Sequence, residues 1–332
     1  MFWVETITDK YSVMNHNYSQ LTMSNALYSL MATEPQLSVA EMEPPAEMPN
    51  WMMAFLAIGI VLAFVWLIRR IVYPKKFSLA NTPGRKNHLH PFHLLALAAA
   101  VVLLSVAATW LLMPLLPSAG RTLSEEVRLP AAPSVSADNV ELKVAVSAVF
   151  HVIALVGGLM IAAMSFDRGI RRGMGLTMRH WRSGAIRGVV ACLIALPACW
   201  GILWLTRQFM LRVGVKAEPG HMLLLAIREM SDPWRILICF MAIVLAPISE
   251  EIIFRGLVQS MVRSYTDRPW VAIITTSVLF GLMHLSVYST IPALVVLAAV
   301  LGYNYERTGR LLSSIVAHAA FNAIFIVQAM TT

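Results

Sequence analysis

The stretch APISEEIIFRGLVQ, residues 246–259, places three charged side chains inside an apolar run that extends from 236 to 261. About 20 apolar residues are enough to cross the hydrocarbon core of a bilayer as an α-helix, so we predict a membrane-spanning helix here. A charged residue at the centre of such a helix costs about 2.5–3.5 kcal/mol on the insertion scale. Glu250, Glu251 and Arg255 therefore mark the candidate functional region.

The whole chain has the composition of a membrane protein. Of its 332 residues, 58% are hydrophobic and 13% are charged, with a mean hydropathy of +0.67, whereas soluble domains carry about 25% charged residues. We predict an all-α, polytopic membrane protein with about eight transmembrane helices and a polar intramembrane cavity. The expected spans are 50–68, 92–116, 144–166, 188–205, 236–261, 270–287, 291–303 and 311–330.

The charges outside these spans are unevenly distributed. Residues 69–90 carry six basic and no acidic side chains, and residues 167–187 carry six arginines and one aspartate, whereas residues 1–49 carry six acids and one lysine. The positive-inside rule predicts that both basic segments are cytoplasmic and both termini are not. The formal net charge of +8 then reflects orientation and contact with anionic membrane lipid, and we predict no nucleic-acid partner. Residues 1–49, acidic and rich in proline, are expected to form a disordered leader.

The three charges of the fifth span are not equivalent. Glu251 and Arg255 are spaced i,i+4, so they can pair on one helical face. Glu250 points about 100° away around the helix and needs a partner elsewhere or access to water. Pro247 removes one helix hydrogen bond and can kink the span, which would open room for water beside Glu250.

Few polar side chains of other spans can serve as that partner. His284 lies in the sixth span, and His318 and Asn322 lie one turn apart in the eighth. His151, in an otherwise apolar third span, is interpreted as a packed, hydrogen-bonded histidine. Three chemistries suit Glu250 with two histidines and an asparagine: a zinc site with an open position for water, direct general-base catalysis with an oxyanion site, or a proton relay in a transporter.

These residues resemble the signatures of a known family, the CAAX prenyl-protease and bacteriocin-processing family of intramembrane proteases, abbreviated CPBP and also called Abi. The family signatures are EExxxR, FxxxH and HxxxN. They are matched by Glu250-Glu251-x-x-x-Arg255, Phe280-x-x-x-His284 and His318-x-x-x-Asn322. The resemblance covers about residues 235–328 and divides the chain into the leader 1–49, N-terminal transmembrane helices and loops at 50–230, and a catalytic helical region at 231–330.

The resemblance implies hydrolysis of a peptide bond within the membrane. Glu250 and His284 would activate water, and His318 and Asn322 would form the oxyanion site. A second set would hold the site together without taking part in the chemistry: Glu251, Arg255 and Phe280.

No cofactor is expected, because Asn322 is a poor zinc ligand and the HExxH pattern is absent. The alternative is zinc bound by Glu250, His284 and His318. The expected partners are membrane lipid and a protein or peptide substrate, with prenylated substrates among the candidates. The expected location is a bacterial inner membrane. Two other functions stay open: a non-catalytic protein of the bacteriocin-immunity kind and a proton-coupled transporter.

Overall fold

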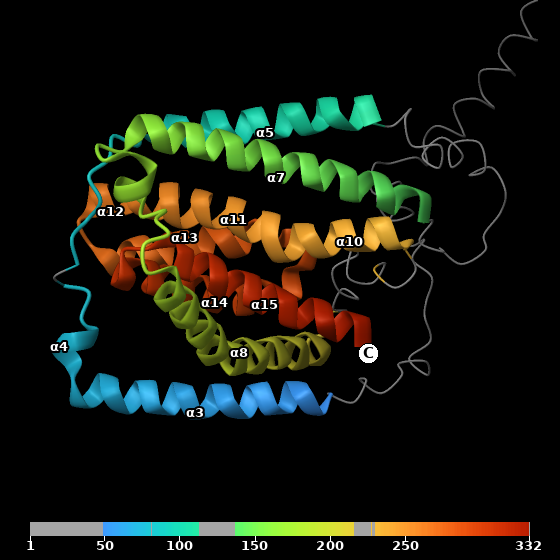
Figure 1. The fold of residues 1–332 in the computed structure, drawn as a ribbon. Helices are drawn as coiled ribbons and strands as arrows, with labels where there is room; N and C mark the ends of the chain where they lie inside the picture. Colours follow the sequence, from blue (N-terminus) through green and yellow to red (C-terminus); the bar gives the residue numbers. More distant parts are fainter. Residues whose placement is uncertain (1–48, 81, 113–136, 216–226, 228–229, 332) are drawn as a thin grey trace, which may run out of the picture. The chain divides into compact units, whose positions relative to one another are not determined.

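A computed structural model of the protein describes residues 49–80, 82–112, 137–215, 227 and 230–331, which belong to one compact unit. The expected leader falls outside the described residues except for its last position, 49. The described part is helical, without β-strands, and its helices are drawn in Figure 1. They are α3 (Asn50–Val72), α4 (Pro74–Phe77), α5 (Pro91–Leu112), α7 (Ala137–Ser165), η3 (Gly169–Met174), α8 (Trp181–Arg212), α10 (Asp232–Phe240), η4 (Met241–Leu245), α11 (Ala246–Glu251), η5 (Ile252–Gln259), α12 (Ser260–Thr266), α13 (Pro269–Leu282), η6 (Leu285–Thr290), α14 (Ile291–Thr308) and α15 (Leu311–Thr331).

The predicted all-α polytopic membrane fold is confirmed. Within the described residues, seven helical segments are long and apolar enough to cross a membrane. The fifth expected span is one of them, running from Asp232 to Thr266 through α10, η4, α11, η5 and α12. The N-terminal segments match the expectation as well, and α8 extends the expected fourth span by seven residues at each end, from 188–205 to 181–212.

The sixth expected span is shorter than predicted. The sequence indicated 270–287, but α13 ends at Leu282 and has 14 residues, which is about 21 Å at 1.5 Å per residue. The chain turns through the short 3₁₀ segment η6 and returns along α13 as α14. A hydrocarbon core is about 30 Å thick, so α13 alone is too short to cross it. Irregular backbone is tolerated there only where protein or a water-filled cavity surrounds it, and Val287, which has non-helical backbone angles, is buried.

Small residues let α8 approach its neighbours closely. Figure 1 shows α3 alongside α8 and α5 alongside α7. A Cβ atom on Gly59 of α3 would collide with the Leu193 carbonyl of α8, and one on Gly188 of α8 would lie 2.6 Å from the Ser313 carbonyl oxygen of α15. Close backbone approach at small residues is the usual basis of helix association in membranes. These contacts fix α8 between α3 and α15.

The two basic segments lie on the same side of the protein. The His88 amide donates to the Ser165 carbonyl (2.8 Å), and the His88 side chain lies 2.9 Å from Asp167. The turn between α14 and α15 joins them, because the Leu311 amide donates to the Gly175 carbonyl (3.1 Å). We call this end of the helices the basic side. The shared side agrees with the charge pattern, and its cytoplasmic location stays a prediction.

We expect single-cysteine variants to report this orientation. With Cys192, Cys199 and Cys239 replaced by alanine, the exposed positions Ser78 and Met178 should, as cysteines, react with a membrane-impermeant maleimide only after permeabilisation. Cysteine at the exposed Val215, which follows the opposite end of α8, should react in intact cells. If Ser78→Cys is labelled from outside intact cells, the predicted orientation is wrong and the basic side is not cytoplasmic.

Candidate active site

The helix that carries Glu250 widens into π turns on both sides of it. The π-helical segment η4 directly precedes α11, and the π-helical segment η5 directly follows it. Pro247, in the first turn of α11, has no amide hydrogen to donate to the carbonyl of Ile243, and its ring crowds that carbonyl. The sequence predicted a kink at this proline. The structure has wider turns there, a departure from α-geometry that often accompanies functional sites.

Glu251 is the centre of a buried ionic contact. Its Oε1 atom lies 2.7 Å from Arg255 Nη1, so the two side chains pair as their spacing suggested, and both are fully buried. The same Oε1 atom lies 3.0 Å from Nδ1 of His318, which is also buried. A carboxylate can only accept a hydrogen bond, so His318 donates from Nδ1 and its Nε2 atom is left for another partner.

Arg255 extends this contact to two further helices. Its Nη2 group donates to the Ala298 carbonyl of α14 (3.2 Å). Its guanidinium carbon lies 4.9 Å from the centroid of the Phe280 ring on α13. Phe280 in turn contacts the rings of His284 (4.9 Å between centroids) and His318 (5.7 Å). Glu251, Arg255 and Phe280 therefore hold α11, α13, α14 and α15 together around one point.

Glu250 has a different environment from its neighbour. Its side chain is 20% exposed, and its Oε2 atom lies 3.8 Å from His318 Nε2. In the described part of the chain, no direct hydrogen bond fixes this carboxylate. Glu250 is thus a partly accessible acid beside a histidine that Glu251 holds in place.

The other two predicted residues are anchored on backbone carbonyls. His284, just after α13, makes a 2.9 Å hydrogen bond from Nδ1 to the Phe280 carbonyl, which accepts, so its Nε2 atom keeps a lone pair in the neutral ring. Asn322 donates from Nδ2 to the Ala242 carbonyl in η4 (2.8 Å). Among the described residues, neither side chain hydrogen-bonds Glu250 directly.

His151, interpreted from the sequence as a packed, hydrogen-bonded histidine, is hydrogen-bonded and lies beside this site. Its Nδ1 atom lies 2.9 Å from the Ser249 hydroxyl, and that hydroxyl donates its own hydrogen to the Ala246 carbonyl. Ser249 therefore accepts from His151, and the Nε2 atom of His151 stays free in the neutral ring. His151 also lies close enough to Glu250, His284 and His318 to interact with them electrostatically.

Nothing near His151 in the sequence indicated this contact. The residue is 98 positions before Ser249 and stands alone in an apolar run. A histidine within a membrane span is unusual enough to count as a functional candidate by default, and this was the one available signal.

The zinc alternative stays a prediction. Glu250, His284 and His318 are chemically suitable ligands. In the part of the chain that the structure describes, however, no three or more His, Cys, Asp or Glu side chains are grouped to hold one ion.

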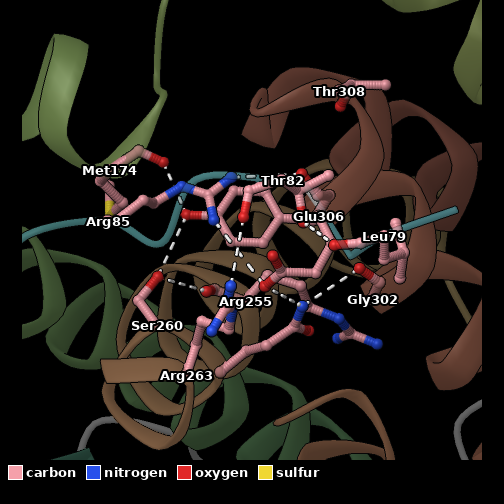
Figure 2. Close-up of polar contacts among 12 residues, drawn as sticks. Leu79, Thr82, Arg85, Met174, Arg255, Ser260, Arg263, Gly302, Glu306 and Thr308 are labelled. Carbon is pink, nitrogen blue, oxygen red and sulfur yellow. Dashed lines mark hydrogen bonds and ion pairs between the residues drawn. The ribbon is translucent and has the colours of Figure 1, made fainter. Parts of the chain in front are cut away.

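A second polar cluster secures the same helix toward the basic side (Figure 2). Gln259, at the end of η5, donates to both the Glu306 carboxylate (3.0 Å) and the Gly302 carbonyl (3.1 Å) of α14. Arg85 lies 3.9 Å from Glu306 and stacks 3.6 Å above the Tyr305 ring. Glu306 lies three residues beyond the expected span 291–303, and its side chain is buried near the end of α14. A Cβ atom at Gly302 would lie 2.8 Å from Gln259 Oε1, so a larger residue there would displace the end of the Gln259 side chain.

We expect the two adjacent glutamates to differ in their effect on stability. Glu251→Gln leaves the fully buried Arg255 without a counter-charge, and breaking a buried pair in this way costs about 3–5 kcal/mol. Glu250→Gln alters a partly exposed carboxylate that no direct hydrogen bond fixes, and should change stability little. Thermal unfolding of the two purified variants in the same detergent measures the difference. Equal melting temperatures would show that Glu251 has no structural role.

The comparison with known proteins bears on residues 232–324. They match the family model described as Type II CAAX prenyl endopeptidase Rce1-like. The match covers less than a third of the chain, and all three motifs lie within it. No curated protein and no solved structure matches the chain. The resemblance drawn from the motifs is therefore confirmed over residues 232–324, which are similar to the CAAX-type, or CPBP, family of intramembrane proteases.

Proposed function

We propose that this protein is an intramembrane endopeptidase in which Glu250 activates a water molecule for attack on a peptide bond. The observation that carries the proposal is the contrast between two adjacent carboxylates. Glu251 is fully buried and paired with Arg255 and His318, whereas Glu250 is 20% exposed and faces His318 Nε2. A general base must reach water and be free to take up a proton, and of these two side chains only Glu250 meets both requirements.

The attack would proceed as follows. Glu250 accepts a proton from the water, and the lone pair on His284 Nε2 helps to orient that water. The oxygen of the water attacks the carbonyl carbon of the scissile bond. The carbonyl oxygen becomes an oxyanion, which donors fixed in advance stabilise most effectively.

His318 and Asn322 would supply those donors. Asn322 uses one N–H on Ala242 and has a second, and His318 donates from Nε2 in its doubly protonated form while Nδ1 stays on Glu251. The proton held by Glu250 then passes to the departing amine. A carboxylic acid and an amine result, and Glu250 is again a carboxylate.

His151 would act as a positioning residue in this scheme. Its hydrogen bond to Ser249 links α7 to the residue directly before Glu250. This link holds the first turn of the motif against α7, so the direction of the Glu250 side chain depends on it.

The substrate we propose is a protein or peptide segment within or at the membrane, because the site lies among helices that cross it. Prenylated C-terminal segments are the first class to test, given the family match. The same match supports hydrolysis over proton-coupled transport. The Glu250 experiment below separates an active protease from a non-catalytic protein of the immunity kind.

We expect Glu250→Gln to abolish proteolysis while leaving the protein folded. General-base catalysis contributes about 10²–10⁴-fold in rate, and glutamine keeps the shape of the side chain without its basicity. Profiling of new protein N-termini in membranes that contain the wild type or the variant identifies cleavages that depend on Glu250, and a farnesylated C-terminal peptide serves as a defined probe. Asp232→Asn, at an exposed carboxylate outside the site, is the matched control. Identical N-terminal profiles for wild type and Glu250→Gln would indicate a non-catalytic protein.

We expect activity to be independent of zinc. Glu250, His284, His318 and Asn322 offer a base and oxyanion donors without a Lewis acid. Elemental analysis of active protein, combined with a chelator titration, measures this directly. Stoichiometric zinc whose removal stops cleavage and whose return restores it would reassign Glu250, His284 and His318 as ligands.

A further inference from the structure

A pocket away from the candidate active site opens on the basic side of the protein. Its volume is about 510 Å³, and it lies between the end of α3, the short helix α4 and the start of α13. Two arginines line it, Arg70 from the last turn of α3 and Arg268 from the residue before α13. None of the residues proposed for catalysis is among its lining residues.

Aromatic side chains give one wall of this pocket a defined shape. Trp270 stacks on Tyr303 (5.9 Å between ring centroids), and Trp66 meets both Tyr303 (6.2 Å) and Phe77 (6.1 Å) edge to face. The Tyr303 hydroxyl donates to the Phe77 carbonyl (3.2 Å). These ring contacts connect α3, α4, α13 and α14, the elements whose ends carry the two arginines that line the pocket.

The positive charge of the pocket is not neutralised by the protein. Among the described residues, neither Arg70 nor Arg268 forms an ion pair with a carboxylate, and the adjacent Asp267 is engaged by Arg263 at 2.6 Å. Arg307 adds a third charge nearby, with its guanidinium carbon 5.5 Å from the Phe77 ring centroid. The first-turn amides of α13, at Trp270 and Val271, have no acceptor within their helix. The guanidinium carbon of Arg70 also lies 5.5 Å from the centroid of the Trp66 ring, a contact that does not neutralise its charge. Guanidinium groups without a counter-charge beside a helix N-terminus favour a phosphate group.

The surroundings of the pocket are apolar on the sides that would face lipid. Ile71 and Val72 on α3 and Ile274 on α13 are exposed by 57–70%. Tryptophan and arginine beside such surfaces are typical of the level at which lipid headgroups lie. The ligand that fits is therefore amphiphilic, with a phosphate for the arginines and hydrocarbon chains for the apolar flanks. We propose that this pocket binds the headgroup phosphate of an anionic phospholipid at a defined site.

The test measures lipid binding to the full-length protein in detergent by native mass spectrometry. Phosphatidylglycerol should bind with defined stoichiometry and more tightly than phosphatidylcholine with the same acyl chains. Arg70→Gln/Arg268→Gln should weaken phosphatidylglycerol binding at least tenfold. The matched control is Lys75→Gln/Lys76→Gln, which removes the same charge from exposed positions of α4 that do not line the pocket.

Each outcome decides the proposal. Loss of phosphatidylglycerol binding in the arginine variant, with less than a twofold change in the lysine control, supports a defined site. Equal loss of binding in both variants would overturn the proposal in favour of diffuse electrostatic attraction. No loss of binding in either variant would overturn it as well, because the lipid would then not bind at this pocket. Glycerol 3-phosphate that displaces the lipid at equal concentration would also overturn it, because the pocket would then recognise a soluble phosphate. If the double variant melts earlier than wild type, the exposed single change Arg268→Gln takes its place, with an expected loss of at least threefold.

Discussion

The candidate site depends on one buried ionic contact, the Glu251 carboxylate held between Arg255 and His318. Two opposite charges at this depth avoid most of the cost of being there only if they stay paired. The pairing therefore fixes where η5 lies relative to α15, and the bond from Arg255 to the Ala298 carbonyl extends the constraint to α14. Because Glu251 carries this structural role, Glu250 next to it is free of one. The two carboxylates are adjacent in the sequence, but the helical rotation of about 100° per residue places one in a buried ion pair and the other in a partly exposed position.

Much of the fold follows from local patterns in the sequence. The apolar runs predict the spans because a helix is the only open segment that satisfies its own backbone in lipid, and the i,i+4 spacing of Glu251 and Arg255 predicts their pair. The short α13 was not predictable in this way. The apolar run was expected to extend the span through residues 283–287, and only packing against α14 shows that the chain turns there. The burial of Glu306 was not predictable from the sequence for a related reason, since its carboxylate is covered by Gln259 from another helix.

The contacts of the site likewise fall into two groups, those within one helix, which the sequence predicts, and those between helices, which it does not. Spacing within a helix places Glu250 beside Glu251 and His318 near Asn322, but it says nothing of distances between helices. His151 contacts Ser249 across 98 residues, and no pattern within α7 encodes that contact. The widening of the helix around Pro247 was expected as a kink, yet whether a proline produces a kink or a π turn depends on the neighbouring helices that accommodate it. Tertiary packing therefore supplies what the motifs omit.

The three histidines of the site form hydrogen bonds in the same way but to partners of different charge. Each engages a partner through Nδ1, namely Ser249 for His151, the Phe280 carbonyl for His284 and Glu251 for His318, and each leaves Nε2 available. The partners differ in charge. A positive charge on His318 would be matched by carboxylates on both sides, whereas His284 and His151 bond to neutral oxygens. The arrangement therefore suits His318 to donating hydrogen bonds to a developing oxyanion and His284 to accepting one from water. The proposed division of roles between these chemically identical rings rests on the oxygen atom that each Nδ1 atom contacts.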